Sequence, residues 1–163
     1  MTKDEIKAFQ RPHGLVVDGI IGPITRAAME AAKTPSAGHI LDARSERNLA
    51  GVHPDLVKIM REAIKRHPVK ATITEGLRTL QRQKQLVAIG ASQTLKSRHL
   101  TGHAVDVVFI VDRRARWDWP LYKAFSNTVK DVALEFGIPI VWGGDWKSFV
   151  DGPHFELNRS NYP

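Results

Sequence analysis

Two short segments of this 163-residue chain hold the side chains best suited to bind a metal ion. In the first, SRHLTGHAVDVV (97–108), His99 and Asp106 stand seven residues apart. The apolar, β-branched run around Asp106 predicts a strand, where an unpaired carboxylate would be costly. His99 lies in the loop just before that strand and can share a cation with Asp106. The segment therefore predicts one part of a metal site.

The second segment, DGPHFEL (151–157), adds an imidazole and another carboxylate. Asp151 precedes His154 by three residues, and a Gly-Pro pair fixes a tight bend between them. Three protein ligands leave a coordination position open for water, and a bound metal lowers the pKa of that water to about 7. We expect His99, Asp106 and His154 to be the ligands and Asp151 to be the general base. With no cysteine in the chain, this donor set suits one catalytic Zn2+.

A rival interpretation pairs His99 with His103 as an i, i+4 metal pair on a helix. Gly102 and the β-branched run that follows argue against a helix there. The glutamate that a helical HExxH site would place beside the first histidine is also missing. Alternation along a strand puts His103 on the face opposite Asp106, so we expect a structural role or a contact behind the ligands.

The elements that must position these residues follow from periodicity and capping signals. Apolar spacing and β-branched runs predict helices at 53–67, 79–89 and 118–137, and strands at 69–74, 104–111, 138–142 and 153–157. No regular βαβ repeat appears, so we expect an α+β fold with a small antiparallel or mixed sheet flanked by helices. Residues 1–33 predict two short helices, too few to fold alone. Residues 34–43 are typical of a linker, which leaves 44–163 as the main domain.

The composition is that of a soluble globular protein with a basic surface. The formal net charge is +7 and the sequence pI about 9.9, which favours anionic partners such as bacterial wall. The densest basic and aromatic cluster is Arg113, Arg114 and Arg116 beside Trp117 and Trp119, but no nucleic-acid motif surrounds it. We therefore expect no nucleic-acid partner. No apolar run is long enough to cross a bilayer.

Together the two segments resemble the zinc peptidases of the D-Ala-D-Ala carboxypeptidase and L-alanyl-D-glutamate endopeptidase family, which share a metal site and fold with the Hedgehog signalling domain. The family pattern is S-x-H-x-x-G-x-A-x-D, then D/E-x-x-H near the C-terminus. The matching residues here are Ser97, His99, Gly102, Ala104, Asp106, Asp151 and His154. VWGGDW (141–146) looks like the endopeptidase branch found in phage lysins. The resemblance covers about residues 44 to 160.

The resemblance implies a role for each matched position. His99, Asp106 and His154 would hold one zinc ion, and Asp151 would be the general base at a position where many relatives have Glu. Arg78 would stabilise the developing oxyanion or grip a substrate carboxylate. The alternative interpretation is that Arg78 is a surface arginine at the start of a helix.

The resemblance also implies substrate contacts. Ser97 would orient a ligand or the substrate, unless it is a plain loop residue. Trp142 and Trp146 would wall the cleft, unless they pack in the core.

The N-terminal piece resembles part of a peptidoglycan-binding module, whose pattern is FQ-x-x-x-GL-x-VDG-x-x-GP-x-T. The matching residues are Phe9, Gly14, Leu15, Val17, Asp18, Gly19, Gly22, Pro23 and Thr25. The piece corresponds to the second half of such a module. It either binds wall or forms a helix–turn–helix hinge that buttresses the rest.

These features predict a peptidoglycan-degrading zinc metallopeptidase, the endolysin of a phage or prophage, that hydrolyses the L-Ala–D-Glu bond of the stem peptide. One alternative is a D-Ala-D-Ala carboxypeptidase of the same fold. Another is a catalytically silent wall-binding module that keeps the metal for stability. The expected partner is peptidoglycan and the expected state a monomer. The first ten residues lack the apolar stretch of a secretory signal, so we expect synthesis in the host cytoplasm and action on the wall after release.

Overall fold

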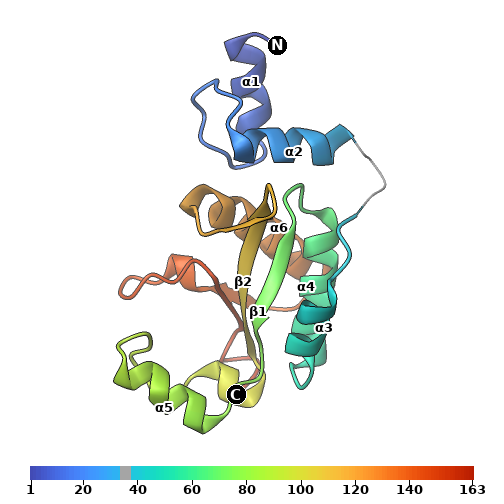
Figure 1. The fold of residues 1–163 in the computed structure, drawn as a ribbon. Helices are drawn as coiled ribbons and strands as arrows, with labels where there is room; N and C mark the ends of the chain where they lie inside the picture. Colours follow the sequence, from blue (N-terminus) through green and yellow to red (C-terminus); the bar gives the residue numbers. More distant parts are fainter. Residues whose placement is uncertain (34–37) are drawn as a thin grey trace.

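A computed structural model describes residues 1–33 and 38–163 of the chain (Figure 1). Its α-helices are α1 (Lys3–Gln10), α2 (Pro23–Lys33), α3 (Ala43–Leu49), α4 (Pro54–Arg66), α5 (Leu80–Ala88) and α6 (Trp119–Phe136). Two short 3-10 helices are η1 (Arg98–Thr101) and η2 (Gly143–Asp145). The strands are β1 (Ala71–Glu75), β2 (Ala104–Val111), β3 (Arg114–Arg116), β4 (Ile140–Trp142) and β5 (His154–Leu157).

The five strands form one antiparallel sheet, in which four follow the order β1-β2-β5-β4 and the fifth, β3, pairs with β2. Strand β2 is the longest and occupies the centre. Its N-terminal half pairs with β5 through residues 104–106, and its C-terminal half pairs with β3 through residues 109–111. Strands β3 and β5 therefore share one side of β2. This small antiparallel sheet flanked by helices confirms the α+β prediction.

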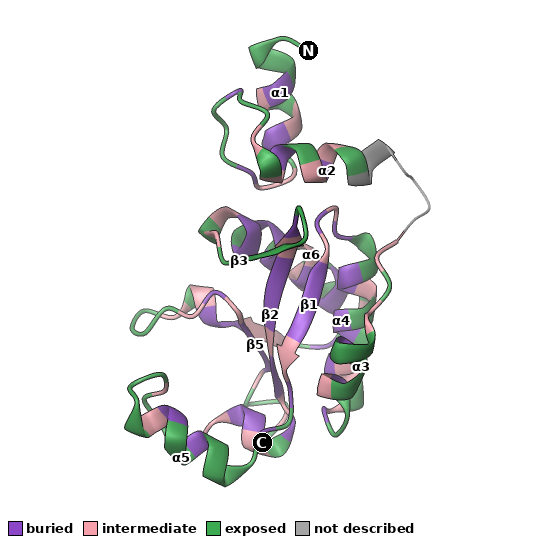
Figure 2. Cartoon of the chain, viewed as in Figure 1, coloured by how far each residue is buried: buried purple, intermediate pink, exposed green. Residues whose placement is uncertain are grey.

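One face of the sheet carries the hydrophobic core. The odd-numbered β2 residues Val105, Val107, Phe109 and Val111 all belong to the core cluster, together with the apolar stripes of α4 and α6. Figure 2 shows β1, β2 and the inner sides of these helices as buried, whereas most of α5 is exposed. The even-numbered Asp106 consequently faces away from the core. The predicted alternation along β2 is confirmed.

Local signals account for the ends of the two main helices. Helix α4 begins at Pro54, a first-turn position where its missing N–H costs nothing, and His53 Nδ1 accepts the Asp55 N–H. Helix α6 follows Asp118 and ends at Gly137, which adopts φ 66°, a conformation suited to glycine. Both helices lie where the apolar spacing predicts them.

Helix α3 and strand β3 were not predicted. Asp42 caps α3 by accepting the Ser45 N–H, and Asn48 near its C-terminal end donates to the carbonyls of Ile73 and Thr74 on β1. The predicted linker, 34–43, ends where α3 begins; residues 34–37 lie outside the described part, and 38–42 have no regular secondary structure.

The N-terminal segment packs against the N-terminal part of α6. Gln10 is buried and holds the α1–α2 loop by donating to Asp18 and to Thr25 and by accepting the Gly19 N–H. Gly14, at φ 63°, approaches so closely that an added Cβ would lie 2.6 Å from the Ala124 Cβ. Leu15 and Ala28 join the same core cluster as α4 and α6. Among the described helices, none is both long enough and apolar enough to span a membrane.

Candidate metal centre

Three strands present polar side chains in one row across the open face of the sheet. The pairing register aligns Glu75 of β1 with Asp106 of β2, and Asp106 with His154 of β5. Residues on either side of this row point into the core, since Phe155 and Val107 are almost fully buried there. The sheet register therefore brings a carboxylate and an imidazole together from segments 48 residues apart.

The second imidazole comes from the loop before β2. Ser97 caps η1 by accepting the His99 N–H at 3.3 Å, and Gly102 ends the turn at φ 70°. An added Cβ on Gly102 would lie 2.3 Å from the Gly51 carbonyl oxygen, so only glycine fits here. This short turn aims His99, which is 1% exposed, at Asp106.

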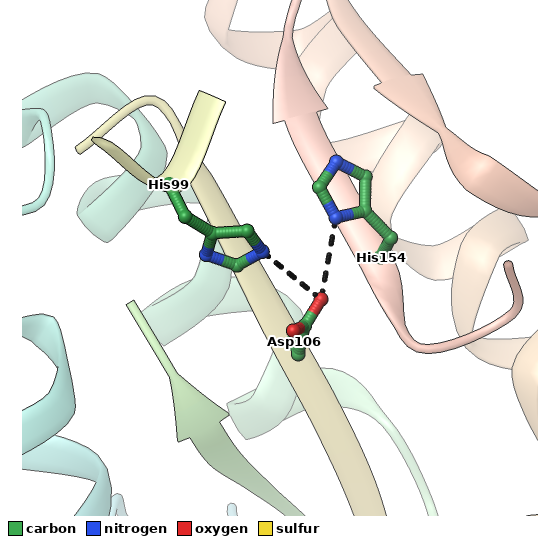
Figure 3. Close-up of side chains that lie close together, drawn as sticks. All are labelled: His99, Asp106 and His154. Carbon is green, nitrogen blue, oxygen red and sulfur yellow. Dashed lines mark hydrogen bonds and ion pairs between the residues drawn. The ribbon is translucent and has the colours of Figure 1, made fainter. Parts of the chain in front are cut away.

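The three predicted ligands converge on one point (Figure 3). The Oδ1 atom of Asp106 lies 3.3 Å from His99 Nε2 and 3.3 Å from His154 Nδ1. One donor atom from each residue lies within 4.8 Å of the other two. Ligands of a tetrahedral zinc ion at bond lengths of 2.0–2.2 Å are about 3.4 Å apart. The spacing therefore fits a small divalent cation.

Hydrogen bonds behind the histidines also fit a metal. His99 Nδ1 lies 2.8 Å from the Gly76 carbonyl oxygen, which makes it the protonated nitrogen and leaves the Nε2 lone pair free. That Nε2 is buried without a hydrogen-bond partner, as expected of an atom whose partner is a cation. On the other side, His154 Nε2 lies 3.0 Å from Glu156 Oε2, so Nδ1 is the nitrogen that faces Asp106 and can bind a metal once it has lost its proton.

The carboxylates around His154 set the charges of the site. Although burial favours neutral imidazole, contacts with Asp106 and Glu156 raise the pKa of His154 to about 9. Burial likewise opposes ionisation of Asp106, but the His154 and His99 contacts hold its pKa far below the ordinary range. Asp106 is thus an anion at any working pH. A cation that binds Nδ1 of His154 must displace a proton there.

Asp151 lies beside the three ligands, in a bend fixed by tight packing. Its backbone N–H donates to the Gly143 carbonyl at 3.0 Å, and an added Cβ on Gly143 would lie 2.5 Å from the Asp151 carbonyl oxygen. Burial raises the pKa of Asp151, and the negative charge of Asp106 raises it further. A divalent cation nearby would lower the pKa of Asp151. A half-buried carboxylate in this setting can take up and release a proton.

Arg78 is mostly engaged with protein groups. Its guanidinium makes four hydrogen bonds, two to Glu75, one to Gln83 and one of 3.4 Å to Asp106. Of the five N–H donors of an arginine, this leaves at most one free. Few donors are therefore left for the expected grip on a substrate carboxylate, and one of the others contacts Asp106.

The two predicted tryptophans have different environments. Trp146 lines the cleft, with its ring 5.0 Å from that of His154. Trp142 is 5% exposed, stacks on Trp119 and donates from Nε1 to the Gly152 carbonyl at 2.7 Å. The structure thus assigns Trp142 to supporting the 151–154 bend from the core, in place of the expected substrate contact.

The proposed site residues other than Trp142 line a cleft of about 640 Å3. Its walls include the three ligands, Asp151, Ser97 and Arg78, and also the rim residues Trp117 and Phe149. His103 lies apart, with Nδ1 2.8 Å from Thr101 Oγ1 and its ring beside that of His53.

Sequence reasoning overlooked two carboxylates of the site. Glu156 stands two residues after His154 on the same strand, so the period of two could have placed it on the same face. Glu75 ends β1 three residues before Arg78, and only the strand register shows that it lies beside Asp106.

Comparison with known proteins agrees with this geometry. Residues 38–158 match the family model described as phage L-alanyl-D-glutamate peptidase, and residues 1–29 match a putative peptidoglycan binding domain. The crystal structure of the Serratia marcescens L-Ala D-Glu endopeptidase ChiX superposes with a TM-score of 0.73 at 47% identity, over 80% of this chain and 98% of that one. The likeness places the chain among small α+β endopeptidases.

Curated relatives point the same way. The L-alanyl-D-glutamate peptidase of Escherichia phage T5 is 35% identical over 72% of this chain and 88% of the relative. That of Listeria phage A118 is 38% identical over 58% of this chain but only 32% of its own length. The chain belongs to the phage L-alanyl-D-glutamate peptidase family.

Proposed function

We propose that this protein hydrolyses the L-Ala–D-Glu bond of the peptidoglycan stem peptide, with one zinc ion held by His99, Asp106 and His154. The observation that carries the proposal is the convergence of these three side chains beside Asp151 in one cleft. Membership of the family supports the choice of bond. The two-imidazole, one-carboxylate donor set supports zinc over Mg2+ or Ca2+, which prefer oxygen ligands.

Each residue then has a defined task. His99, Asp106 and His154 would hold the ion, which would supply Lewis acidity to polarise the scissile carbonyl and to lower the pKa of the attacking water. Asp151 accepts the proton of that water and delivers it to the leaving amine. Arg78, which is itself bound by Glu75, holds Asp106 in place, and Ser97 holds His99 through its backbone N–H. Trp146 forms one wall of the cleft against which the substrate backbone packs.

We also propose a division of labour along the chain. Residues 44–163 form the peptidase domain, 34–43 the linker, and 1–33 a wall-contacting segment, supported by the match of 1–29 to a peptidoglycan-binding model. Since all candidate site residues come from one chain, we propose that a monomer is active. Its phage relatives support synthesis in the host cytoplasm followed by release to the wall.

Muropeptide analysis of purified sacculi tests the proposed reaction. Digestion should release stem peptides beginning with D-Glu and leave L-Ala on the glycan. A chelator should stop this release, and added Zn2+ should restore it. Loss of single terminal D-Ala residues would instead identify a carboxypeptidase. Wall binding without any cleavage in the presence of Zn2+ would show that the domain is catalytically silent.

A further inference from the structure

The candidate cleft is lined by guanidinium groups as well as by carboxylates. Three arginines line it, namely Arg78, Arg98 and Arg159. Arg78 is matched by Glu75 and Asp106, as described above. Arg159 contacts Glu156 of β5, and Arg98 of η1 lines the same cleft.

Arg98 is a buried cation with incomplete hydrogen bonding. It is 8% exposed, and its Nη2 donates to the Tyr162 carbonyl at 2.5 Å. Its Nε is buried without a hydrogen-bond partner. Arg98, Glu156 and Arg159 line the same cleft.

Arg159 has donors to spare. Its side chain is 59% exposed, and within the described residues its hydrogen bonding consists of one contact of 3.3 Å from Nε to Glu156 Oε1. The other oxygen of Glu156 is bound to His154. Arg159 thus keeps guanidinium donors that no described residue accepts, beside a carboxylate that already serves a candidate metal ligand.

The proposed substrate brings an anion to the reacting bond. A glutamyl residue that continues the peptide through one carboxyl group keeps the other as a free carboxylate. When the chain continues through the side chain, that free group is the α-carboxylate, attached to the carbon that bears the scissile nitrogen. A planar guanidinium suits a carboxylate, and a contact between opposite charges in a half-enclosed cleft is strong.

We propose that Arg159, supported by Arg98, binds the free α-carboxylate of the D-glutamyl residue on the leaving-group side of the scissile bond. This inference rests on the proposed function and names a specificity residue for it. Arg159 then distinguishes stem peptides with a free α-carboxylate from those in which this group is an uncharged amide.

Two synthetic stem peptides that differ only at this group test the inference. One carries D-Glu with a free α-carboxylate, and the other carries the α-carboxamide. The Zn2+-loaded wild-type protein should cleave the acid with a kcat/KM about 10- to 100-fold above that for the amide, the worth of one charge-assisted hydrogen bond. In Arg159→Gln this ratio should fall to near one. Any disturbance of Glu156 and His154 should lower kcat/KM for both peptides by the same factor. The ratio of the two values therefore reports on the carboxylate contact alone.

Arg44→Gln is the matched control, because it removes the same charge from the exposed surface of α3, outside the cleft lining. It should keep both kcat/KM values. A wild-type protein without preference for the acid, or an Arg159→Gln variant that keeps the preference, overturns the inference. Failure to cut either peptide between L-Ala and D-Glu overturns the proposed function, and the inference with it.

Discussion

The two candidate histidine ligands are each held from behind by a different kind of acceptor. His99 Nδ1 donates to the backbone carbonyl of Gly76, whereas His154 Nε2 donates to the Glu156 carboxylate. A carboxylate partner makes the imidazole a stronger electron donor to a metal than a neutral carbonyl does. The two ligands are therefore expected to contribute unequally to metal affinity, and Glu156 is the residue that tunes one of them.

Glu156→Gln should weaken metal binding while leaving the ligand set intact. The amide keeps the size and one acceptor atom but loses the charge, and changes of this kind typically cost about 10- to 100-fold in affinity or activity. Competition with a chromophoric chelator measures the affinity for Zn2+. Glu135→Gln, at an exposed ion pair with Arg66, is the control. Equal affinities in the two variants would show that Glu156 does not act through His154.

Asp151→Asn should separate chemistry from metal binding. The amide fits the same bend but cannot take a proton, so kcat should fall by about 10²- to 10⁴-fold while one Zn2+ per chain is retained. Stopped digestion of stem peptide together with metal analysis of the same sample measures both. Asp145→Asn, in an exposed pair with Lys130, should change neither quantity. Loss of the metal from Asp151→Asn would instead make Asp151 a ligand.

At the scale of elements, the sequence predicts a helix or strand best where one local pattern is enough to define it. The alternation in β2 places Asp106 on the open face, and capping residues place the ends of α4 and α6. The sequence identifies all three ligand candidates because each lies in or next to a strand or turn that the local pattern predicts clearly. Strand β3 escapes prediction because Arg114–Arg116 has no apolar alternation and is held only by pairing with β2.

Other features depend on contacts that no local pattern contains. Helix α3 is only seven residues long, and Asn48 fixes it to β1. The engagement of Arg78 follows from the alignment of Glu75 with Asp106 across two strands. The burial of Trp142 follows from the packing of β4 beside α6, which a five-residue apolar run cannot reveal.

The junction of α4 with α6 contains a buried histidine that should make stability depend on pH. His67, the C-cap of α4, is 3% exposed, and its ring packs edge-on against Phe125 of α6. Burial lowers the pKa of His67 to about 3. Because the unfolded chain binds this proton near pH 6.5, the native state should lose stability as the pH falls from 6.5 towards 3. The loss amounts to about 2 kcal/mol at pH 5.

His67→Leu should remove this part of the pH dependence. Chemical unfolding at pH 7 and pH 5 gives the free energies, and the difference between the two values should be smaller in the variant than in the wild type by that amount. Met60→Leu, fully buried on the same helix but without a titrating group, should keep the wild-type difference. An unchanged pH dependence in His67→Leu would mean that other groups cause it.

At the scale of the whole molecule, the N-terminal segment is joined to the peptidase domain by packing as well as by the chain. Its loop meets α6 at Gly14, and Leu15 extends the core cluster. The sequence predicts the two helices of this segment. It does not predict their packing against α6, because nothing in the sequence distinguishes Ala124 from other small residues in helices.

Gly14→Ala should weaken the packing of the N-terminal segment against α6. The new Cβ would collide with Ala124, and the backbone at φ 63° is strained for any residue with a Cβ, a combined cost of roughly 1–2 kcal/mol or more. Hydrogen exchange should become faster in residues 1–33, while the 44–163 part keeps its protection. Gly22→Ala is the matched control, since nothing lies within 4 Å of its added Cβ. Unchanged exchange in Gly14→Ala would show that the contact with α6 is not what orders the segment.

The alignment of β2 with β5 has a consequence for how the protein matures. A slip of one residue between these strands would send the His154 imidazole into the apolar interior and turn Phe155 outwards. A misaligned chain would then present only two of the three proposed ligands. The proposed metal site can therefore form only in molecules in which β2 and β5 are correctly paired.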